Sequence, residues 1–311
     1  GPAWSNSLFE DNAEFGYGML LAQQAIRDGL KAKVEEVAAN ENATAEVKAA
    51  CQEWLDTFGV GATNGAATDK LVAALENVDC PTCKDIVKNK DFLAKKSQWI
   101  FGGDGWAYDI GFNGVDHVLA SGKDINIMVF NTEVYSNTGG QSSKATPTGA
   151  VAQFAAGGKE VKQKDLAAIA MSYGYVYVAQ ISMGADMNQT IKAIAEAEAY
   201  PGPSLIIAYA PCINHGIKKG MAKAQTEEKL AVQSGYWNLF RFNPAAEGKK
   251  FSLDCKPATV DYQEFIKGEV RYTSLALKNP ARAEKLFAKA EQNAKDKYAY
   301  LEKLVTLYDE K

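Results

Sequence analysis

The chain has 311 residues, of which 47% are hydrophobic, and a formal net charge of −4 with a pI near 5.5. This length can bury a sizeable core in one large domain with a small helical appendage, and the acidic balance argues against nucleic acid or an anionic membrane surface as a partner. No apolar stretch approaches the roughly 20 residues that span a bilayer, so no membrane partner is expected.

The amino-terminal part is predicted to be helical. A helix is expected over residues 11–30, and residues 31–96 are expected to form an exposed helical excursion, because their Ala, Glu and Lys residues follow helical spacing up to the glycine-rich stretch 59–65. Cys80 and Cys83 form a CxxC pair that favours a turn near solvent, although a metal or redox role stays open. Five cysteines without a recognisable signal peptide are typical of a reducing compartment, and the missing initiator methionine suggests that the chain begins within a longer protein.

Short apolar runs then alternate with helical patterns. The pattern predicts strands and helices in strict alternation: strand 97–102, helix 106–120, strand 124–130, helix 164–173, strand 175–181, helix 187–199 and strand 204–210. Such alternation indicates an α/β fold with a doubly wound, mainly parallel sheet. We therefore expect an α/β domain over residues 1–221, followed by a mostly helical carboxy-terminal extension over 222–311 that packs against a partner domain.

Polar residues follow the first two of these strands. Gly103, Asp104 and Gly105 come after the first strand, and Thr132 and Val134 after the second. Ligands bind beyond the carboxyl ends of parallel strands. A carboxylate, a hydroxyl and a backbone carbonyl are oxygen ligands of the kind that Mg²⁺ needs when it bridges a diphosphate. The pattern therefore predicts a magnesium and thiamine diphosphate site, whereas the glycine spacing does not fit a dinucleotide-binding Gly-x-Gly-x-x-Gly turn.

Two longer strings carry a family resemblance. Residues 102–111 read GGDGWAYDIG, and residues 131–150 read NTEVYSNTGGQSSKATPTGA. They resemble the thiamine diphosphate fold, with Thr132 in place of its second asparagine. More narrowly, they resemble the carboxy-terminal, thiamine diphosphate-binding domain of single-chain pyruvate:ferredoxin (flavodoxin) oxidoreductases. The likeness extends to residues 1–19, 180–183 and 200–221, and fades over 31–78 and after 243.

The resemblance implies a set of site residues. Magnesium ligands would be Asp104, Thr132 and the carbonyl of Val134. Asn137 would be catalytic, facing the substrate pocket, although an Asx turn is the alternative; Trp106 would cover the cofactor or lie in the core. The full cofactor-binding set is Gly103, Asp104, Gly105, Trp106, Thr132, Glu133, Val134, Tyr135, Ser136 and Asn137.

Cys212 is the second candidate site. It follows the strand 204–210, where the family places one thiolate ligand of a [4Fe-4S] cluster, and the other three ligands would lie outside this chain. Without that resemblance, a lone cysteine on an apolar turn is an ordinary buried thiol. We expect a structural role for His117, a turn or a cluster-tuning role for His215, and solvation or a domain contact for the lysines Lys144, Lys218 and Lys219.

By resemblance, the whole enzyme oxidatively decarboxylates pyruvate with coenzyme A to acetyl-CoA and CO₂. Electrons pass through Fe–S clusters to ferredoxin or flavodoxin. The expected partners are the remaining domains of the same enzyme and a second copy in a homodimer, in the cytoplasm or an anaerobic organelle. No glutamate here has the context to contact the aminopyrimidine ring, so we expect this chain to be an incomplete part of the enzyme. Two alternatives stay open: an iron-free thiamine-dependent decarboxylase or lyase, which would not need Cys212, and a non-catalytic fragment or subunit.

Overall fold

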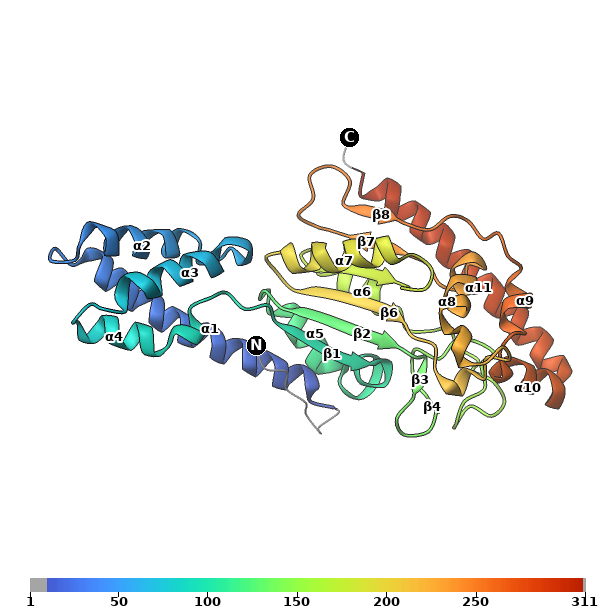
Figure 1. Cartoon of the computed structure of the whole chain (residues 1–311). Helices are drawn as coiled ribbons and strands as arrows, with labels where there is room; N and C mark the ends of the chain where they lie inside the picture. Colours follow the sequence, from blue (N-terminus) through green and yellow to red (C-terminus); the bar gives the residue numbers. More distant parts are fainter. Residues whose placement is uncertain (1–9, 310–311) are drawn as a thin grey trace. The chain divides into compact units, whose positions relative to one another are not determined.

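The structure, a computed structural model, describes residues 10–309. It divides the chain into two compact units. The first covers Phe15–Gln98, and the described part of the second covers residues 10–14 and 99–309. Each unit is described by itself, and Figure 1 gives the labels used below.

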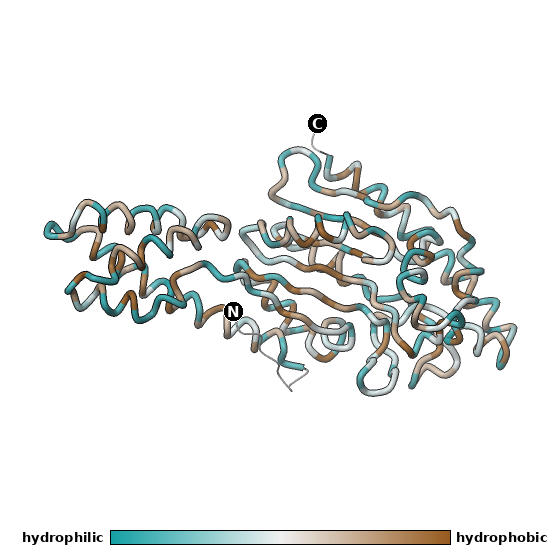
Figure 2. Tube along the Cα trace, viewed as in Figure 1, coloured by the Kyte–Doolittle hydropathy of each residue, from teal (hydrophilic) through white to brown (hydrophobic). Residues whose placement is uncertain are grey.

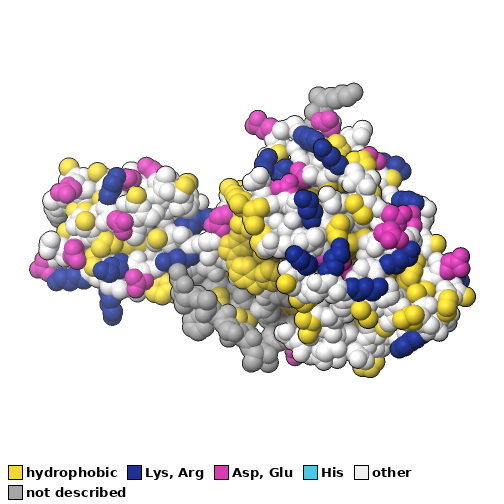
Figure 3. All heavy atoms as spheres, turned by 45° about the vertical axis from the view of Figure 1, so that its right-hand side comes forward, with side chains coloured by type: hydrophobic (Ala, Val, Ile, Leu, Met, Phe, Trp, Pro, Cys, Tyr) yellow, Lys and Arg dark blue, Asp and Glu magenta, His cyan; other side chains and the backbone are white. Residues whose placement is uncertain are grey.

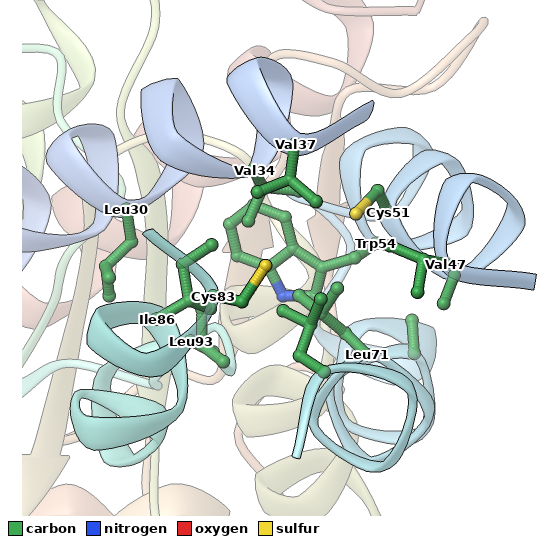
Figure 4. Close-up of a cluster of buried hydrophobic side chains, with 13 residues drawn as sticks. Leu30, Val34, Val37, Val47, Cys51, Trp54, Leu71, Cys83, Ile86 and Leu93 are labelled. Atoms are coloured by element: carbon green, nitrogen blue, oxygen red, sulfur yellow. The ribbon is translucent and has the colours of Figure 1, made fainter. Parts of the chain in front are cut away.

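The first unit consists of helices around its own core. Helix α1 runs over Asn12–Ala39, α2 over Ala45–Asp56, α3 over Gly61–Leu75 and α4 over Pro81–Lys88, followed by a 3₁₀ turn η1 over Lys90–Phe92. Their buried side chains surround Trp54 (Figure 4). The Trp54 indole N–H donates to Thr68 Oγ1 at 3.1 Å. The helical prediction is confirmed, but α1 continues nine residues beyond the predicted end at residue 30 because Val34 and Val37 bury in this core.

Cys80 and Cys83 begin a helix. Cys80 is the N-cap of α4, its sulfur accepts the backbone N–H of Cys83 at 3.4 Å, and Pro81 occupies the first helical turn. Cys83 is buried in the core of the unit. All five cysteines are free thiols. The turn predicted from the CxxC spacing is thus a capped helix start.

The second unit is built on a six-stranded sheet with strand order β1-β2-β6-β5-β7-β8. Its first four strands pair in parallel: β1 (Trp99–Gly103), β2 (Asn126–Asn131), β6 (Ser204–Tyr209) and β5 (Tyr177–Ile181). Strands β7 (Phe240–Phe242) and β8 (Phe251–Leu253) add antiparallel at the β5 edge. The predicted mainly parallel α/β fold is confirmed.

Helices cover both faces of this sheet. Helices α5 (Phe112–Ala120) and α6 (Leu166–Met171) lie on one face and α7 (Met187–Ala199) on the other (Figure 1). This arrangement follows from right-handed crossovers, because the chain moves along the sheet from β1 to β5 and then turns back to β6. The apolar runs of the central strands are buried between the layers, as the hydrophobic colours along β2 and β6 illustrate (Figure 2).

The carboxy-terminal segment is mostly helical, as predicted. It contains the 3₁₀ turn η4 (Met221–Lys223) and the helices α8 (Ala224–Gln233), α9 (Tyr262–Ile266), α10 (Val270–Lys278) and α11 (Pro280–Leu307). It also supplies β7 and β8, which the sequence reasoning missed because strands of three residues are too short for a recognisable alternation. The predicted domain boundary at residue 221 stays a prediction.

The surface carries charges of both signs. On the face seen in Figure 3, Lys and Arg side chains are interspersed with Asp and Glu. Among the described residues, no helix combines the length and the hydrophobicity that crossing a membrane requires.

Candidate active site at the carboxyl ends of three strands

Three neighbouring parallel strands end at the candidate site. Asp104 follows β1, Thr132 follows β2, and Cys212 comes three residues after β6. The segment after β2 folds back as a small hairpin of β3 (Val134–Tyr135) and β4 (Gln141–Ser142). The segment after β6 forms a 3₁₀ turn η3 over Ile213–His215. Sheet order alone therefore brings the three predicted site segments to one edge.

Asp104 is completely buried and accepts hydrogen bonds from neutral donors. Its Oδ1 accepts the backbone N–H of Thr132 at 3.0 Å and the Thr132 hydroxyl at 2.8 Å. Its Oδ2 accepts the Ser143 hydroxyl at 2.5 Å. Burial raises the pKa of Asp104 from its ordinary 3.8 to about 6, although the hydrogen bonds from Ser143 and Thr132 favour the charged form. The fold thus holds a carboxylate whose charge is only partly compensated.

The three predicted metal ligands lie together. Thr132 Oγ1 is 2.8 Å from Asp104 Oδ1 and 2.9 Å from the carbonyl oxygen of Val134. A carboxylate oxygen and a carbonyl oxygen therefore both lie within hydrogen-bonding distance of one hydroxyl, and these three oxygen types are the donor set that Mg²⁺ prefers. No group of three or more His, Cys, Asp and Glu side chains is arranged for a metal within residues 10–309. The site thus offers one carboxylate together with neutral oxygens.

The turn after Asp104 is a π-helical turn, not the regular helix start that was predicted for 106–120. It is η2 over Gly105–Ile110, and it closes with the N–H of Gly111 donating to the carbonyl of Trp106 at 2.8 Å. The buried Trp106 indole packs against two glycines, since a Cβ on Gly111 would lie 2.1 Å from the ring and a Cβ on Gly102 2.2 Å from it. Trp106 lies in the core; its contact with a cofactor stays a prediction.

Gly103 and Gly105 differ in what surrounds them. A Cβ on Gly105 would lie 2.5 Å from the ring of Tyr135, so this glycine is needed for packing within the chain. A Cβ on Gly103 would meet no atom closer than the carbonyl of Phe130 at 4.0 Å. No atom of the described residues therefore requires a glycine at position 103.

Cys212 is buried and receives three hydrogen-bond donors. Ser136 Oγ lies 3.1 Å from its sulfur, the backbone N of Asn214 at 3.5 Å and the Asn214 side-chain nitrogen at 3.4 Å. Ser136 Oγ is also 2.8 Å from Thr132 Oγ1. The predicted cluster ligand and the predicted metal ligands are therefore neighbours joined through one hydroxyl.

A buried network of charged side chains holds both the segment after β2 and the turn after β6. His215 Nε2 donates to the carbonyl of Thr132 at 2.7 Å. Its Nδ1 lies 3.7 Å from Glu269, which pairs with Arg271 at 2.7 Å, and Arg271 pairs with Glu133 at 2.7 Å. Burial raises the pKa of Glu269 to about 7, while burial and then the charge of Arg271 lower the pKa of His215 well below its usual value. A neutral His215 thus holds the Thr132 loop by its Nε2–H.

Glu133 is occupied by this network. It adopts a left-handed conformation with φ of 62°, is completely buried, and also accepts hydrogen bonds from Tyr236 at 2.6 Å and Gln163 at 3.0 Å. Both carboxylate oxygens therefore have partners within the chain.

The remaining candidates lie at the margins. Asn137 is exposed in the loop between β3 and β4, while Tyr135 packs on Gly105. His117 lies on α5, Lys218 and Lys219 are exposed, and Lys144 pairs with Asp109 at 2.6 Å while its side chain stays 61% exposed. A cavity of about 420 Å³ beside α6 and α11 includes none of the predicted metal or cluster ligands.

Sequence reasoning missed several residues of the site. Ser143, Glu269, Arg271 and Tyr236 contact Asp104 or the Glu133 network, yet none belongs to a recognisable motif. Arg271 and Glu269 come from the segment that we expected to be peripheral. The alternation of charged residues with a valine and a tyrosine at 269–272 is the only local hint, and it is equally typical of a surface helix.

Comparison with known proteins first defines the class. Residues 87–208 match the family described as "Thiamine pyrophosphate enzyme, C-terminal TPP binding domain". This range contains β1, β2, β5 and β6 with the helices between them. The sheet unit is therefore a thiamine pyrophosphate-binding fold.

Similar proteins of known activity narrow this class to a family of pyruvate oxidoreductases. The chain is 54% identical to the pyruvate:ferredoxin oxidoreductase of Moorella thermoacetica over 98% of this chain and 27% of that protein. It is 52% identical to the pyruvate-flavodoxin oxidoreductase of Klebsiella pneumoniae, over 98% and 26%. A mitochondrial pyruvate dehydrogenase [NADP(+)] of Euglena gracilis is 47% identical over 94% and 16%. The predicted resemblance to the pyruvate:ferredoxin (flavodoxin) oxidoreductase family is confirmed, and the chain spans about a quarter of the length of the first two relatives.

The buried network generates a stability prediction. Replacing Arg271 by Met leaves Glu133 and Glu269 buried without their cation, so Arg271→Met should lower the free energy of unfolding by about 3–5 kcal/mol. Lys267→Met is the matched control, because the Lys267–Glu264 pair is exposed and should contribute less than about 1 kcal/mol. Urea unfolding measures both changes. A loss at Arg271 as small as that at Lys267 would contradict the structural role.

The raised pKa of Asp104 generates a pH prediction. Its pKa in the folded chain exceeds its ordinary value, so the folded state binds the proton more tightly and stability falls as pH rises from about 4 to about 6. Asp104→Asn keeps the shape without the charge. Between pH 4 and pH 7, the free energy of unfolding of Asp104→Asn should rise relative to that of wild type by up to about 3 kcal/mol. Urea unfolding at several pH values tests this, and a pH-independent difference would show that burial of Asp104 has no such cost.

Proposed function

We propose that this chain binds the diphosphate of thiamine diphosphate through Mg²⁺ within a 2-oxoacid:ferredoxin oxidoreductase that acts on pyruvate. The convergence of the Asp104, Thr132 and Val134 oxygens at the carboxyl ends of β1 and β2 carries the proposal. Octahedral Mg²⁺ would take its remaining oxygens from the diphosphate and water. The cation would also compensate the buried negative charge of Asp104. The hydrogen bonds that Asp104 accepts come from neutral groups and offset the cost of burying this charge only in part.

The surroundings suit an approaching diphosphate. The space beside the Gly103 Cα would let the ligand come close to the backbone, while Tyr135 packs on Gly105. When bound, thiamine diphosphate supplies the electron sink for loss of CO₂ from a 2-oxoacid. The exposed amide of Asn137 would hydrogen-bond the substrate, which must then enter from the side of this loop.

Completion of the site by other domains is part of the proposal. Glu133 has all its oxygens engaged, so the acid that contacts the aminopyrimidine ring would come from outside the chain. Cys212 would be one of four thiolate ligands of a [4Fe-4S] cluster, with the other three on another segment of the whole protein. Its position beside Ser136 and Thr132 supports a short electron path from cofactor to cluster.

Substrate and partners follow from the names of the relatives. Pyruvate is common to all three, whereas their names carry ferredoxin, flavodoxin and NADP⁺. We infer that this chain contributes to the reaction of pyruvate and that other domains select the electron acceptor, here ferredoxin or flavodoxin. Coenzyme A would accept the acyl group, the whole enzyme would be a homodimer, and five free thiols suit the cytoplasm or another reducing compartment.

An iron-free thiamine-dependent lyase is the rival function. It requires no thiolate at position 212, where the structure directs three donors onto the sulfur. Replacing Cys212 by Ser in the full-length protein should abolish the EPR signal of one cluster while thiamine diphosphate binding persists. An unchanged set of cluster signals would favour the rival.

The binding proposal is tested by calorimetric titration of thiamine diphosphate with and without Mg²⁺, in this chain and in the full-length protein. Binding should require Mg²⁺ and weaken at least about 100-fold in Asp104→Ala, because the charged ligand is lost. Binding only in the full-length protein would mean that other domains complete the site. If neither form binds, the chain is a non-catalytic module.

The two glycines provide a second prediction. Among residues 10–309, an added Cβ in Gly103→Ala comes no closer than 4.0 Å to any atom, so the variant should fold with a free energy of unfolding within about 1 kcal/mol of wild type. It should nevertheless bind thiamine diphosphate at least about 10-fold more weakly. Gly105→Ala pushes against Tyr135 and should destabilise the fold by about 1–3 kcal/mol. Unaltered cofactor affinity in Gly103→Ala would place the diphosphate elsewhere.

A further inference from the structure

The cavity of about 420 Å³ lies within the unit that carries the sheet, and every residue that lines it belongs to that unit. Gln180 of β5 and Ile207 of β6 line it from paired positions of the sheet. Leu166 of α6 and Ala294 of α11 line it from two helices. Small-molecule sites commonly have volumes of about 300–1,000 Å³, so the cavity is large enough for an organic ligand.

Helix α11 keeps this space open. It carries a stripe of residues at alternating spacings of four and three, which places them on one face of the helix. Five members of the stripe are buried: Ala283, Phe287, Ala290, Leu301 and Leu304. The two members between Ala290 and Leu301 are Ala294 and Lys297, and both line the cavity. Large apolar side chains at these two positions would fill the space, although unfilled interior space costs stability. The sequence of α11 thus maintains the cavity.

The cavity carries an excess of positive charge. Three lysines line it, Lys162, Lys164 and Lys297, against two aspartates, Asp165 and Asp296. Lys297 pairs with Asp165. Within residues 10–309, neither Lys162 nor Lys164 forms an ion pair with a carboxylate. These two ammonium groups are therefore available to an anion that enters the cavity.

Lys164 has neutral partners. Its Nζ donates to the carbonyl oxygen of Tyr108 at 3.0 Å and lies 3.0 Å from the centroid of the Phe112 ring. Burial and then the charge of Lys144 lower the pKa of Lys164 from its ordinary 10.5 to about 8. An anion bound beside this ammonium group would stabilise its charged form.

Aromatic side chains also line the cavity. Trp237 and Tyr262 are buried, and Tyr300 contributes from α11. The indole N–H of Trp237 donates to the carbonyl of Ile181 at 3.0 Å, so the polar group of this side chain is engaged within the chain. The rings offer flat apolar surface, against which a planar aromatic group packs favourably.

We propose that this cavity binds a small organic anion with an aromatic ring. The acidic group would lie near Lys162 and Lys164, and the ring would pack against Trp237 and Tyr262. None of the residues proposed to hold magnesium or thiamine diphosphate lines the cavity, so this ligand and the cofactor can be bound together. The inference is therefore independent of the proposed function.

The test is a fluorescence titration of the full-length protein, with saturating Mg²⁺ and thiamine diphosphate, using two probes. Anilinonaphthalene sulfonate is an aromatic anion, and phenylnaphthylamine has the same rings without the sulfonate. Ala294→Leu should abolish a saturable binding event for the anionic probe that wild type shows, because leucine fills the cavity. Lys164→Met should weaken binding of the anionic probe at least about 10-fold, because a charged hydrogen-bond donor is lost. The affinity for the uncharged probe should stay within about twofold in Lys164→Met, since that probe makes no charged hydrogen bond.

Lys144→Met is the matched control for charge. Lys144 does not line the cavity, and its side chain is 61% exposed, so its loss should change the affinity for the anionic probe by less than about twofold. Ala283→Leu is the control for volume, because Ala283 is buried in α11 away from the cavity. It should lower the urea midpoint, whereas Ala294→Leu should maintain or raise it.

Three results would overturn the inference. The first is the absence of saturable binding of the anionic probe to wild type, and the second is binding that persists unchanged in Ala294→Leu. The third is an equal loss of affinity for both probes in Lys164→Met, which would show that the cavity does not select an anion.

Discussion

The site depends on one constraint, a carboxylate buried where three parallel strands end. Asp104 is inaccessible to solvent, and its recorded hydrogen-bond partners, Thr132 and Ser143, are neutral. A buried anion without a cation is costly, and a protein retains such a group when a bound ion compensates it. The adjacent hydroxyl and carbonyl oxygens and the open space beside Gly103 are understandable on the same basis. In the proposed magnesium site, these oxygens would complete the coordination of a cation that balances the charge of Asp104.

The loops around this carboxylate are held by the interior of the carboxy-terminal segment. Arg271 pairs with both Glu133 and Glu269. Glu133 follows Thr132 in the chain, and Glu269 lies beside His215, which belongs to the turn that carries Cys212. The segment after β2 and the turn that carries Cys212 therefore share one buried ionic network. This arrangement explains why a segment that has no chemistry of its own belongs to the same compact unit as the site.

Much of this could be predicted from the sequence because the determinants are local. Strands β1, β2, β5 and β6 are short and mostly apolar, α7 begins and ends where predicted, and the polar segments after the strands mark one sheet edge. The remainder depends on contacts distant in sequence. Ser143 reaches Asp104 across 39 positions and Tyr236 reaches Glu133 across 103, so no local pattern could reveal them. The π-turn at Gly105–Ile110 depends likewise on how the Trp106 ring packs between two glycines.

The most direct test of this account is to locate the cation. Mn²⁺ prefers the same oxygen ligands as Mg²⁺ and gives an anomalous X-ray signal, so crystals of the full-length protein with Mn²⁺ and thiamine diphosphate would reveal its position. The account predicts one Mn²⁺ at coordination distance, about 2.1 Å, from Asp104, Thr132 Oγ1 and the Val134 carbonyl. A Mn²⁺ bound elsewhere, with the Thr132 hydroxyl still donating to Asp104, would contradict it.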